Sequence, residues 1–122
     1  MTGDGGVPVP TDPEDAKIIT LARSALARTQ ARQGACVRDT DGRTYAASSV
    51  DLPHLRLSAV AVAVAMAVSS GAAGLEAVAL AGAAPDPGDL DVVRDLPGQG
   101  VALWHVDPRG QVQGRVEVRA TA

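Results

Sequence analysis

Apolar positions along the chain follow two periods, one typical of helices and one typical of strands. The first segment of helical period follows Asp12 and Pro13, a pair that favours a helix start, and it ends before Gly34. One stripe of apolar side chains recurs along it: Ile18, Leu21, Ala22, Ala25 and Leu26. The pattern therefore predicts a flexible tail over residues 1–12, and then a single domain over residues 13–122 that opens with an amphipathic helix.

Shorter apolar runs separated by turn residues predict five strands. The first two flank residues 39–42, whose sequence is typical of a hairpin turn. The third is apolar except for Glu76, as expected of a central strand, and the fifth alternates apolar and polar residues, as in an edge strand. The runs cover residues 35–38, 44–50, 75–81, 101–106 and 112–119.

A second helix is predicted over residues 57–70, where almost every position is apolar. Gly71 ends it, and a loop over residues 51–55 precedes it. Residues 90–96 predict a short third helix after a loop at 83–88. Because helices and strands are mixed along the chain, the fold class is α/β with a partly antiparallel sheet. A helix that is apolar all round must be covered on all sides, so we expect a further surface to complete the cover.

Composition and charge exclude several classes of protein. The formal net charge is -3, with one Trp, one Tyr and no Phe, which argues against a nucleic-acid partner. The single cysteine allows no intramolecular disulfide, and the first residues lack the features of a secretory signal, so a cytoplasmic protein is expected. The apolar run of the second helix is shorter than the about 20 residues that span a bilayer, so no membrane partner is expected.

The sequence resembles the small cytidine deaminases in local stretches and in the order of its elements. Residues 34–45 are similar to the first hairpin of that family, and residues 67–71 to the Ala-Val-Ser-Glu-Gly end of its central helix. Residues 75–81 fall where the family has its third strand. The resemblance implies a three-layer sandwich, with helices on both faces of a five-stranded mixed sheet. It also implies a homo-oligomer, dimer or tetramer, because those deaminases assemble as tetramers.

The residues that carry the zinc chemistry of that family differ here. Its signature is His/Cys-x-Glu at the start of the central helix and Pro-Cys-x-x-Cys downstream. Ser58 stands at the first ligand position and Val60 at the glutamate position, and residues 81–96 contain no Cys or His. A serine hydroxyl is a poor zinc ligand, and a valine carries no proton. We therefore expect no metal, no cofactor and no catalytic residue, with Ser58 and Val60 as degenerate positions.

Polar residues near the start of the central helix are the candidates for ligand binding. The family holds ribose with Asn-x-Glu just after its second strand, and the resemblance places residues 49–51 there. Arg56 is either a clamp for a phosphate or a solvated surface residue. The predicted site for a nucleoside-like small ligand or another anion consists of Asp51, His54, Arg56 and Ser58.

Two other arrangements of polar groups have less support. Asp51, His54 and Ser58 would form a nucleophilic triad only if the imidazole lay within hydrogen-bond reach of the hydroxyl. Cys36, His54 and His105 are the only Cys and His residues, and no two of them have a local chelating spacing. A zinc site built from them is therefore not expected, and Cys36 is expected to be a small buried residue.

Three functions agree with these observations. The first is a non-catalytic protein of the cytidine deaminase fold that acts as an oligomer or binds a small ligand or a protein. The second is an active nucleoside deaminase or other hydrolase with a divergent site around Asp51, His54 and Ser58. The third is a module that binds another protein through the apolar surface of the second helix.

Overall fold

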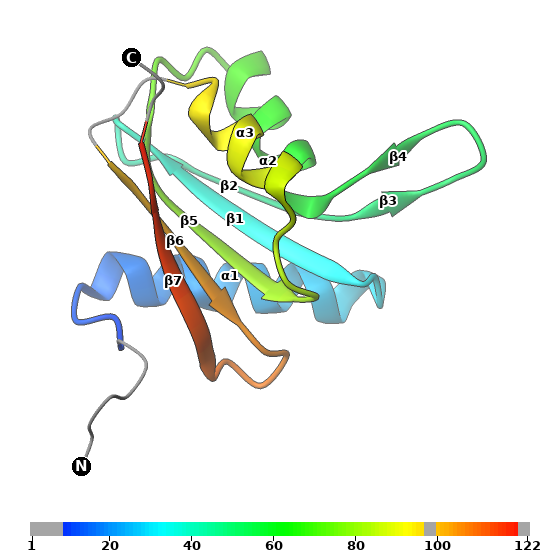
Figure 1. Ribbon diagram of the computed structural model, residues 1–122, viewed down its shortest axis with the longest axis horizontal. Helices are drawn as coiled ribbons and strands as arrows, with labels where there is room; N and C mark the ends of the chain where they lie inside the picture. The colour runs from blue at the N-terminus through cyan, green and yellow to red at the C-terminus, as the bar shows by residue number, and fades with distance from the viewer. Residues whose placement is uncertain (1–8, 97–99, 120–122) are drawn as a thin grey trace.

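A five-stranded mixed sheet lies at the centre of the computed structural model, which describes residues 9–96 and 100–119 (Figure 1). Its strands are β1 (Gln33–Asp39), β2 (Thr44–Ser48), β5 (Leu75–Gly82), β6 (Val101–Val106) and β7 (Val112–Val118). They lie in the order β2-β1-β5-β6-β7, with β5 and β6 parallel and the other neighbours antiparallel. The predicted α/β class with a five-stranded mixed sheet is confirmed, and β7 forms one edge of the sheet as its alternation predicted.

Within the described residues, three helices cover the two faces of this sheet (Figure 1). Helix α1 (Pro13–Thr29) lies on one face, and helices α2 (Ala59–Ser69) and α3 (Pro87–Arg94) lie on the other. The side chain of the residue before each helix accepts a hydrogen bond from a free backbone N–H of the first turn. These capping residues are Asp12, Ser58 and Asp86. The predicted three-layer sandwich is confirmed.

Alternate residues of the central strands point to opposite faces and build two separate cores. Three alanines of β5 belong to the core beneath α1, whereas Val78 and Leu80 belong to the core beneath α2 and α3. Strand β1 lies close to α1 at Gly34, where an added Cβ would meet the backbone carbonyl oxygen of Ala22. Small side chains on this face therefore allow the helix to lie close to the sheet.

Residues 50–57 form an arm that extends away from the sandwich, where a loop was predicted over residues 51–55 (Figure 1). Strands β3 (Val50–Asp51) and β4 (Arg56–Leu57) pair antiparallel, and across the turn Leu52 N donates to Leu55 O at 2.8 Å. The predicted strand over residues 44–50 is therefore divided, because the chain leaves the main sheet after β2. We refer to residues 50–57 as the β3–β4 arm.

Helices α2 and α3 begin at other residues than predicted, because their capping residues set where each helix starts. Helix α2 begins at Ala59 rather than at residue 57, because Ser58 is its cap. Helix α3 begins at Pro87 rather than at residue 90, because Asp86 caps it, so part of the predicted loop at 83–88 is helical. Most of the predicted tail over residues 1–12 falls outside the described residues.

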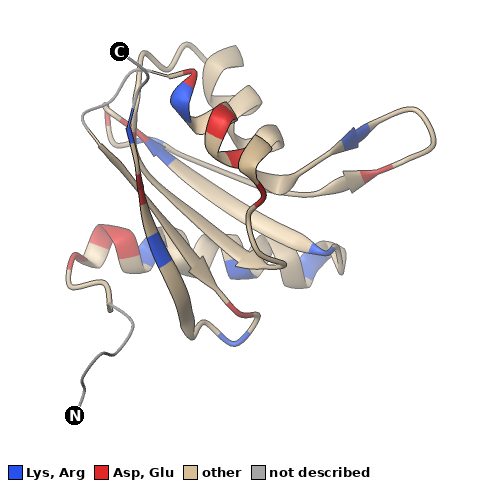
Figure 2. Cartoon of the chain, viewed as in Figure 1, with Lys and Arg blue, Asp and Glu red and all other residues tan. Residues whose placement is uncertain are grey.

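Helix α2 is only partly covered within the chain. Met66 is 40% exposed and Val68 is 53% exposed, whereas Val60 and Val64 are buried. Figure 2 shows that this helix carries no charged residue. That a further surface covers it therefore stays a prediction. Across residues 9–96 and 100–119, none of the helices has the length and apolar character needed to span a bilayer.

Candidate functional site

A cleft of about 670 Å³ opens beside the start of β1 and the start of α2. Residues 30–33 and Ser49 line one side, and the base of the β3–β4 arm lines a second. Ser58 lines it at the start of α2, and Ala83, Ala84 and Asp86 line it from the segment between β5 and α3. Small-molecule sites usually have volumes of about 300–1,000 Å³, so the cleft is large enough for a small ligand.

The start of α2 borders the cleft through Ser58. Its Oγ accepts a hydrogen bond from the backbone N–H of Ala61 at 3.1 Å, so the hydroxyl caps the helix. Two residues further on, Val60 is fully buried and packs in the core beneath α2. Ser58 and Val60, which the sequence analysis expects to be the degenerate positions of a zinc ligand and a glutamate, therefore serve helix capping and core packing.

The start of α3 contains a second set of motif positions, which the sequence analysis missed. Residues 85–89 read Pro-Asp-Pro-Gly-Asp, which has the spacing of Pro-Cys-x-x-Cys with aspartates in place of both cysteines. Asp86 Oδ1 accepts from Asp89 N at 2.9 Å, and Asp89 Oδ2 accepts from Asp86 N at 3.1 Å. This reciprocal pair forms a capping box, and Asp89 is only 2% exposed. Both carboxylates therefore stabilise the helix start.

These residues do not fit a catalytic zinc ion. Such an ion takes three protein ligands, mostly imidazole or thiolate, and leaves one position open for water. Ser58, Asp86 and Asp89 supply one hydroxyl and two carboxylates, and each of these side chains already accepts a backbone hydrogen bond. Within residues 9–96 and 100–119, no group of three or more His, Cys, Asp or Glu side chains is placed to hold a metal.

Gln33 is a further residue of the cleft that the sequence analysis missed. Its side-chain Oε1 accepts from the backbone N–H of Ala59 at 3.4 Å, and its Nε2 donates to the carbonyls of Ala83 at 3.1 Å and Ala84 at 3.4 Å. Its backbone N–H donates to Ser49 Oγ at 3.2 Å. Gln33 is 8% exposed, so a single buried amide contacts both segments that carry the motif positions.

The predicted ligand residues are brought together only in part. Asp51, Arg56 and Ser58 line the cleft, whereas His54 lies in the exposed turn of the β3–β4 arm. Asp51 and Arg56 form an ion pair at 3.4 Å, with both side chains mostly exposed. Among the described residues, His54 has no hydrogen bond to Ser58 or Asp51. The geometry therefore does not assemble the triad that was considered from the sequence.

The remaining Cys and His residues lie in different parts of the sandwich. Cys36 is fully buried on the face of β1 that packs against α1, and burial raises the pKa of its thiol to about 11. His105 lies on β6, with its Nε2 2.8 Å from the carbonyl oxygen of Gly82. Both residues are thus engaged in packing or in contacts with the backbone.

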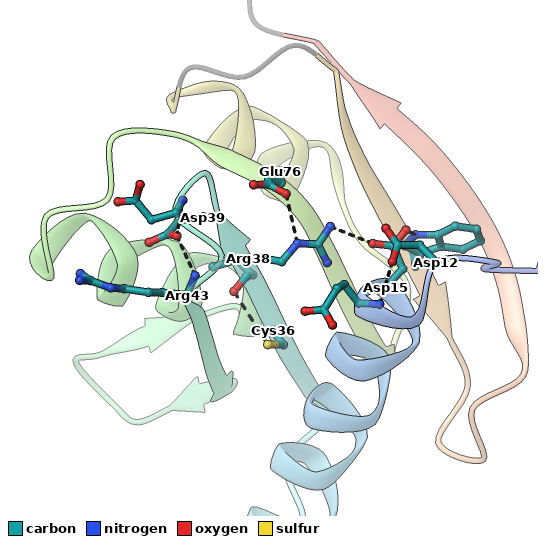
Figure 3. Close-up of polar contacts among 11 residues, drawn as sticks. Asp12, Asp15, Cys36, Arg38, Asp39, Arg43 and Glu76 are labelled. Carbon is teal, nitrogen blue, oxygen red and sulfur yellow. Dashed lines mark hydrogen bonds and ion pairs between the residues drawn. The ribbon is translucent and has the colours of Figure 1, made fainter.

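A network of charged groups surrounds Arg38 near the end of β1 (Figure 3), whereas the cleft lies beside the start of that strand. The guanidinium of Arg38 contacts Asp15 at 3.1 Å and Glu76 at 3.3 Å, and Asp15 also accepts from Trp104 Nε1 at 3.3 Å. Burial lowers the pKa of Arg38, but the two carboxylates outweigh it and raise that pKa above its ordinary value. The network links α1 to three strands.

Asp39, the next residue along β1, has a buried carboxylate that organises the hairpin turn. Its Oδ1 accepts from the backbone N–H groups of Asp41 and Arg43, and its Oδ2 from the Tyr45 hydroxyl, each at 2.9 Å. Burial raises the pKa of Asp39, but the bonds from Arg43, Tyr45 and Asp41 outweigh it and hold that pKa below its ordinary value. The charged groups of β1 therefore maintain the fold at the end away from the cleft.

Comparison with known proteins agrees with this architecture. A family model described as cytidine deaminase-like matches residues 11–110. The structure is similar to cytidine deaminase from Burkholderia pseudomallei, with TM-score 0.70 and 21% identity over 84% of this chain and 91% of that chain. For the cytidine deaminase from Mycobacterium leprae the TM-score is 0.66, with 16% identity over 84% of this chain and 92% of that chain. For a point mutant of the cytidine deaminase from Mycobacterium tuberculosis the TM-score is 0.64, with 22% identity over 77% of this chain and 85% of that chain.

None of the curated proteins matches the chain significantly. At the identities given above, the similarity to the three solved structures shows a shared fold. The family model covers most of the sequence, including β1, the start of α2 and the start of α3. The chain belongs to the cytidine deaminase-like family.

Proposed function

We propose that this protein is a non-catalytic member of its family, which has kept the scaffold and the cleft and has lost the zinc chemistry. One observation carries the proposal: the positions of the metal ligands and of the proton carrier are Ser58, Val60, Asp86 and Asp89. Each of these side chains is used for a helix cap or for the core. Hydrolytic deamination needs an activated water and a free group that moves protons. Val60 carries no proton, and the carboxylates of Asp86 and Asp89 are held in the cap of α3.

The proposal is tested by incubating the purified protein with cytidine in zinc-supplemented buffer and following the loss of cytidine absorbance and the release of ammonia. A rate equal to that of buffer alone is expected, and a known cytidine deaminase serves as the positive control. Zinc-dependent ammonia release above the buffer rate would overturn the proposal. It would favour an active deaminase with a divergent site.

The cleft is proposed to bind a small polar ligand of nucleoside-like size. Support comes from its volume and from its lining of hydroxyl, amide and charged groups at Ser58, Gln33 and Arg56. Titrating cytidine and cytidine 5′-phosphate into isotope-labelled protein should shift the backbone resonances of cleft residues selectively. If Arg56 holds a phosphate, Arg56→Gln weakens binding of the phosphorylated compound only. Unchanged resonances at millimolar concentrations of both compounds would argue against this ligand class.

We propose that the chain self-associates into a homo-oligomer, either a dimer or a tetramer. Two exposed apolar regions support this proposal, because assembly would cover them. Met66 and Val68 are exposed on α2, and Leu52 and Leu55 are exposed on the β3–β4 arm, at 54% and 49%. The same regions are the proposed contact for a different protein partner if self-association is absent. The lone buried Cys36 supports a cytoplasmic setting, where thiols remain reduced.

Light scattering on surface variants tests the self-association. Val68→Asp should reduce the mass to that of one chain, whereas Ser24→Asp, on the exposed face of α1, should leave it unchanged. Substitution of Val60 or Val64 by Asp would not separate the two effects, because both residues are buried in the core. A Val68→Asp variant with unchanged mass would exclude this face of α2 as the contact.

A further inference from the structure

The Gln33 side chain joins two segments that are far apart in the sequence. Through Oε1 it accepts from Ala59 N at the start of α2, 26 residues away, and through Nε2 it donates to Ala83 O, 50 residues away. The neighbouring main chain adds to this contact, because Ala83 N donates to Arg32 O at 3.2 Å. The start of α2 and the segment before α3 are therefore both fixed to β1 at one buried residue.

In zinc deaminases the same two segments share a metal. One ligand comes from the start of the central helix and two come from Pro-Cys-x-x-Cys, so the ion itself ties the segments together. The residues at those positions here do not fit zinc, yet the two segments still meet at the cleft.

We infer that the Gln33 carboxamide is the cross-link that positions the start of α2 against the segment before α3, so that the cleft keeps its shape without a metal. An amide suits this task because it has an acceptor and two donors in one plane. It pairs a backbone N–H on one side with backbone carbonyls on the other, and buried backbone groups are costly to leave unpaired. Only one part of this inference rests on the proposed function: the statement that the Gln33 contacts act where zinc deaminases use a metal ion.

Substitutions of Gln33 separate the two halves of the cross-link. Gln33→Met keeps a long unbranched side chain and removes both halves. The Ala59 amide loses its acceptor, and the Ala83 amide, which donates to Arg32 O, lies in a segment that is no longer held at its carbonyl, so both should exchange hydrogen at least about fivefold faster than in the native protein. Gln33→Glu, once its carboxyl group is ionised, keeps the acceptor and removes the donor to Ala83 O, so the Ala83 amide should exchange faster while the Ala59 amide keeps its protection. In the matched control Gln111→Met, at an exposed glutamine, both amides should exchange at the native rate.

A result in which both Gln33 variants leave the two amides at native rates would overturn the inference. So would equal acceleration of the β6 and β7 amides, because that pattern reports a general loss of stability. The native protein provides a measurement that needs no variant. The side-chain amide protons of Gln33 should exchange at least about tenfold more slowly than those of exposed Gln111. Equal rates would show that the cross-link does not form.

Zinc content and deaminase activity of the native protein test the proposed function and are independent of these exchange rates. A native protein that bound zinc and still protected the Gln33 amide would refute the proposed function alone. A zinc-free protein with an unprotected Gln33 amide would refute the cross-link alone.

Discussion

Strand β1 and the β3–β4 arm border the same cleft, but they are built in opposite ways. Every residue of β1 is buried, whereas every residue of the arm except Val50 is exposed. The arm carries Asp51, His54 and Arg56, which the sequence indicated as ligand residues. Strand β1 carries Gln33, which it did not indicate. The comparison shows that polar residues near a motif mark the rim of the cleft, while its frame depends on buried contacts of the central strand.

The largest expected effect on stability comes from a steric clash between β1 and α1. In Gly34→Ala the new Cβ would meet the carbonyl oxygen of Ala22 and lie 2.6 Å from the backbone nitrogen of Leu26. We expect the free energy of unfolding to fall by more than about 3 kcal/mol. Gly114→Ala on the edge strand is the control, because nothing lies within 4 Å of its added Cβ. Urea unfolding measures both variants, and equal stabilities would show that α1 lies farther from β1.

Removal of the Arg38 guanidinium should have the next largest effect. Arg38→Met removes a buried guanidinium and leaves the half-buried carboxylate of Asp15 without its cation, at a cost of about 2.5 kcal/mol. Arg119→Met removes an exposed ion pair with Glu117 and should cost less than about 0.5 kcal/mol. Urea unfolding of the two variants compares them directly. A cost for Arg38→Met as small as that for Arg119→Met would contradict a buried network.

The Asp39 carboxylate should make stability depend on pH. Because its pKa is lower in the folded chain than its ordinary value of 3.8, its stabilisation is present above that value and is lost as the pH falls through the folded pKa. Asp39→Asn should cost about 2 kcal/mol near pH 7, and the cost should fall progressively as the pH drops below 3.8. Urea unfolding at several pH values tests this. A cost that stays constant with pH would show that the charge is not the stabilising feature.

Changes in the arm should have the smallest effect on stability. His54→Ala and Arg56→Gln should each change the free energy of unfolding by less than about 0.5 kcal/mol, because the first side chain is exposed and the second forms an exposed ion pair. Thermal unfolding of the two variants beside Gly34→Ala checks this. Losses above about 1 kcal/mol would mean that the arm is part of the packed fold.

Most of the fold was predictable because its signals are local. The Asp12 cap with Pro13 and the apolar stripe behind it predicted α1, and the alternation over residues 112–119 predicted the edge strand. The β3–β4 arm was not predictable in the same way. Its strands are two residues long and pair only with each other, so they leave no periodic pattern.

The cleft was predictable only where a motif marks it. The sequence indicated Ser58 and Val60 because the resemblance to a known family places its signature there. Asp86 and Asp89 had an available signal, the spacing of Pro-Cys-x-x-Cys, but a search for Cys and His alone does not find aspartates there. Gln33 had no local signal, since its contacts involve residues that the fold brings from 26 and 50 positions away.

The most direct test of the account is the zinc content of protein produced in zinc-supplemented medium, measured by mass spectrometry of the metal. The native protein should hold far less than one zinc per chain, whereas the triple variant Ser58→Cys, Asp86→Cys, Asp89→Cys should hold about one, because three thiolates can complete such a site. One tightly bound zinc per native chain would contradict the claim that this scaffold has lost its metal.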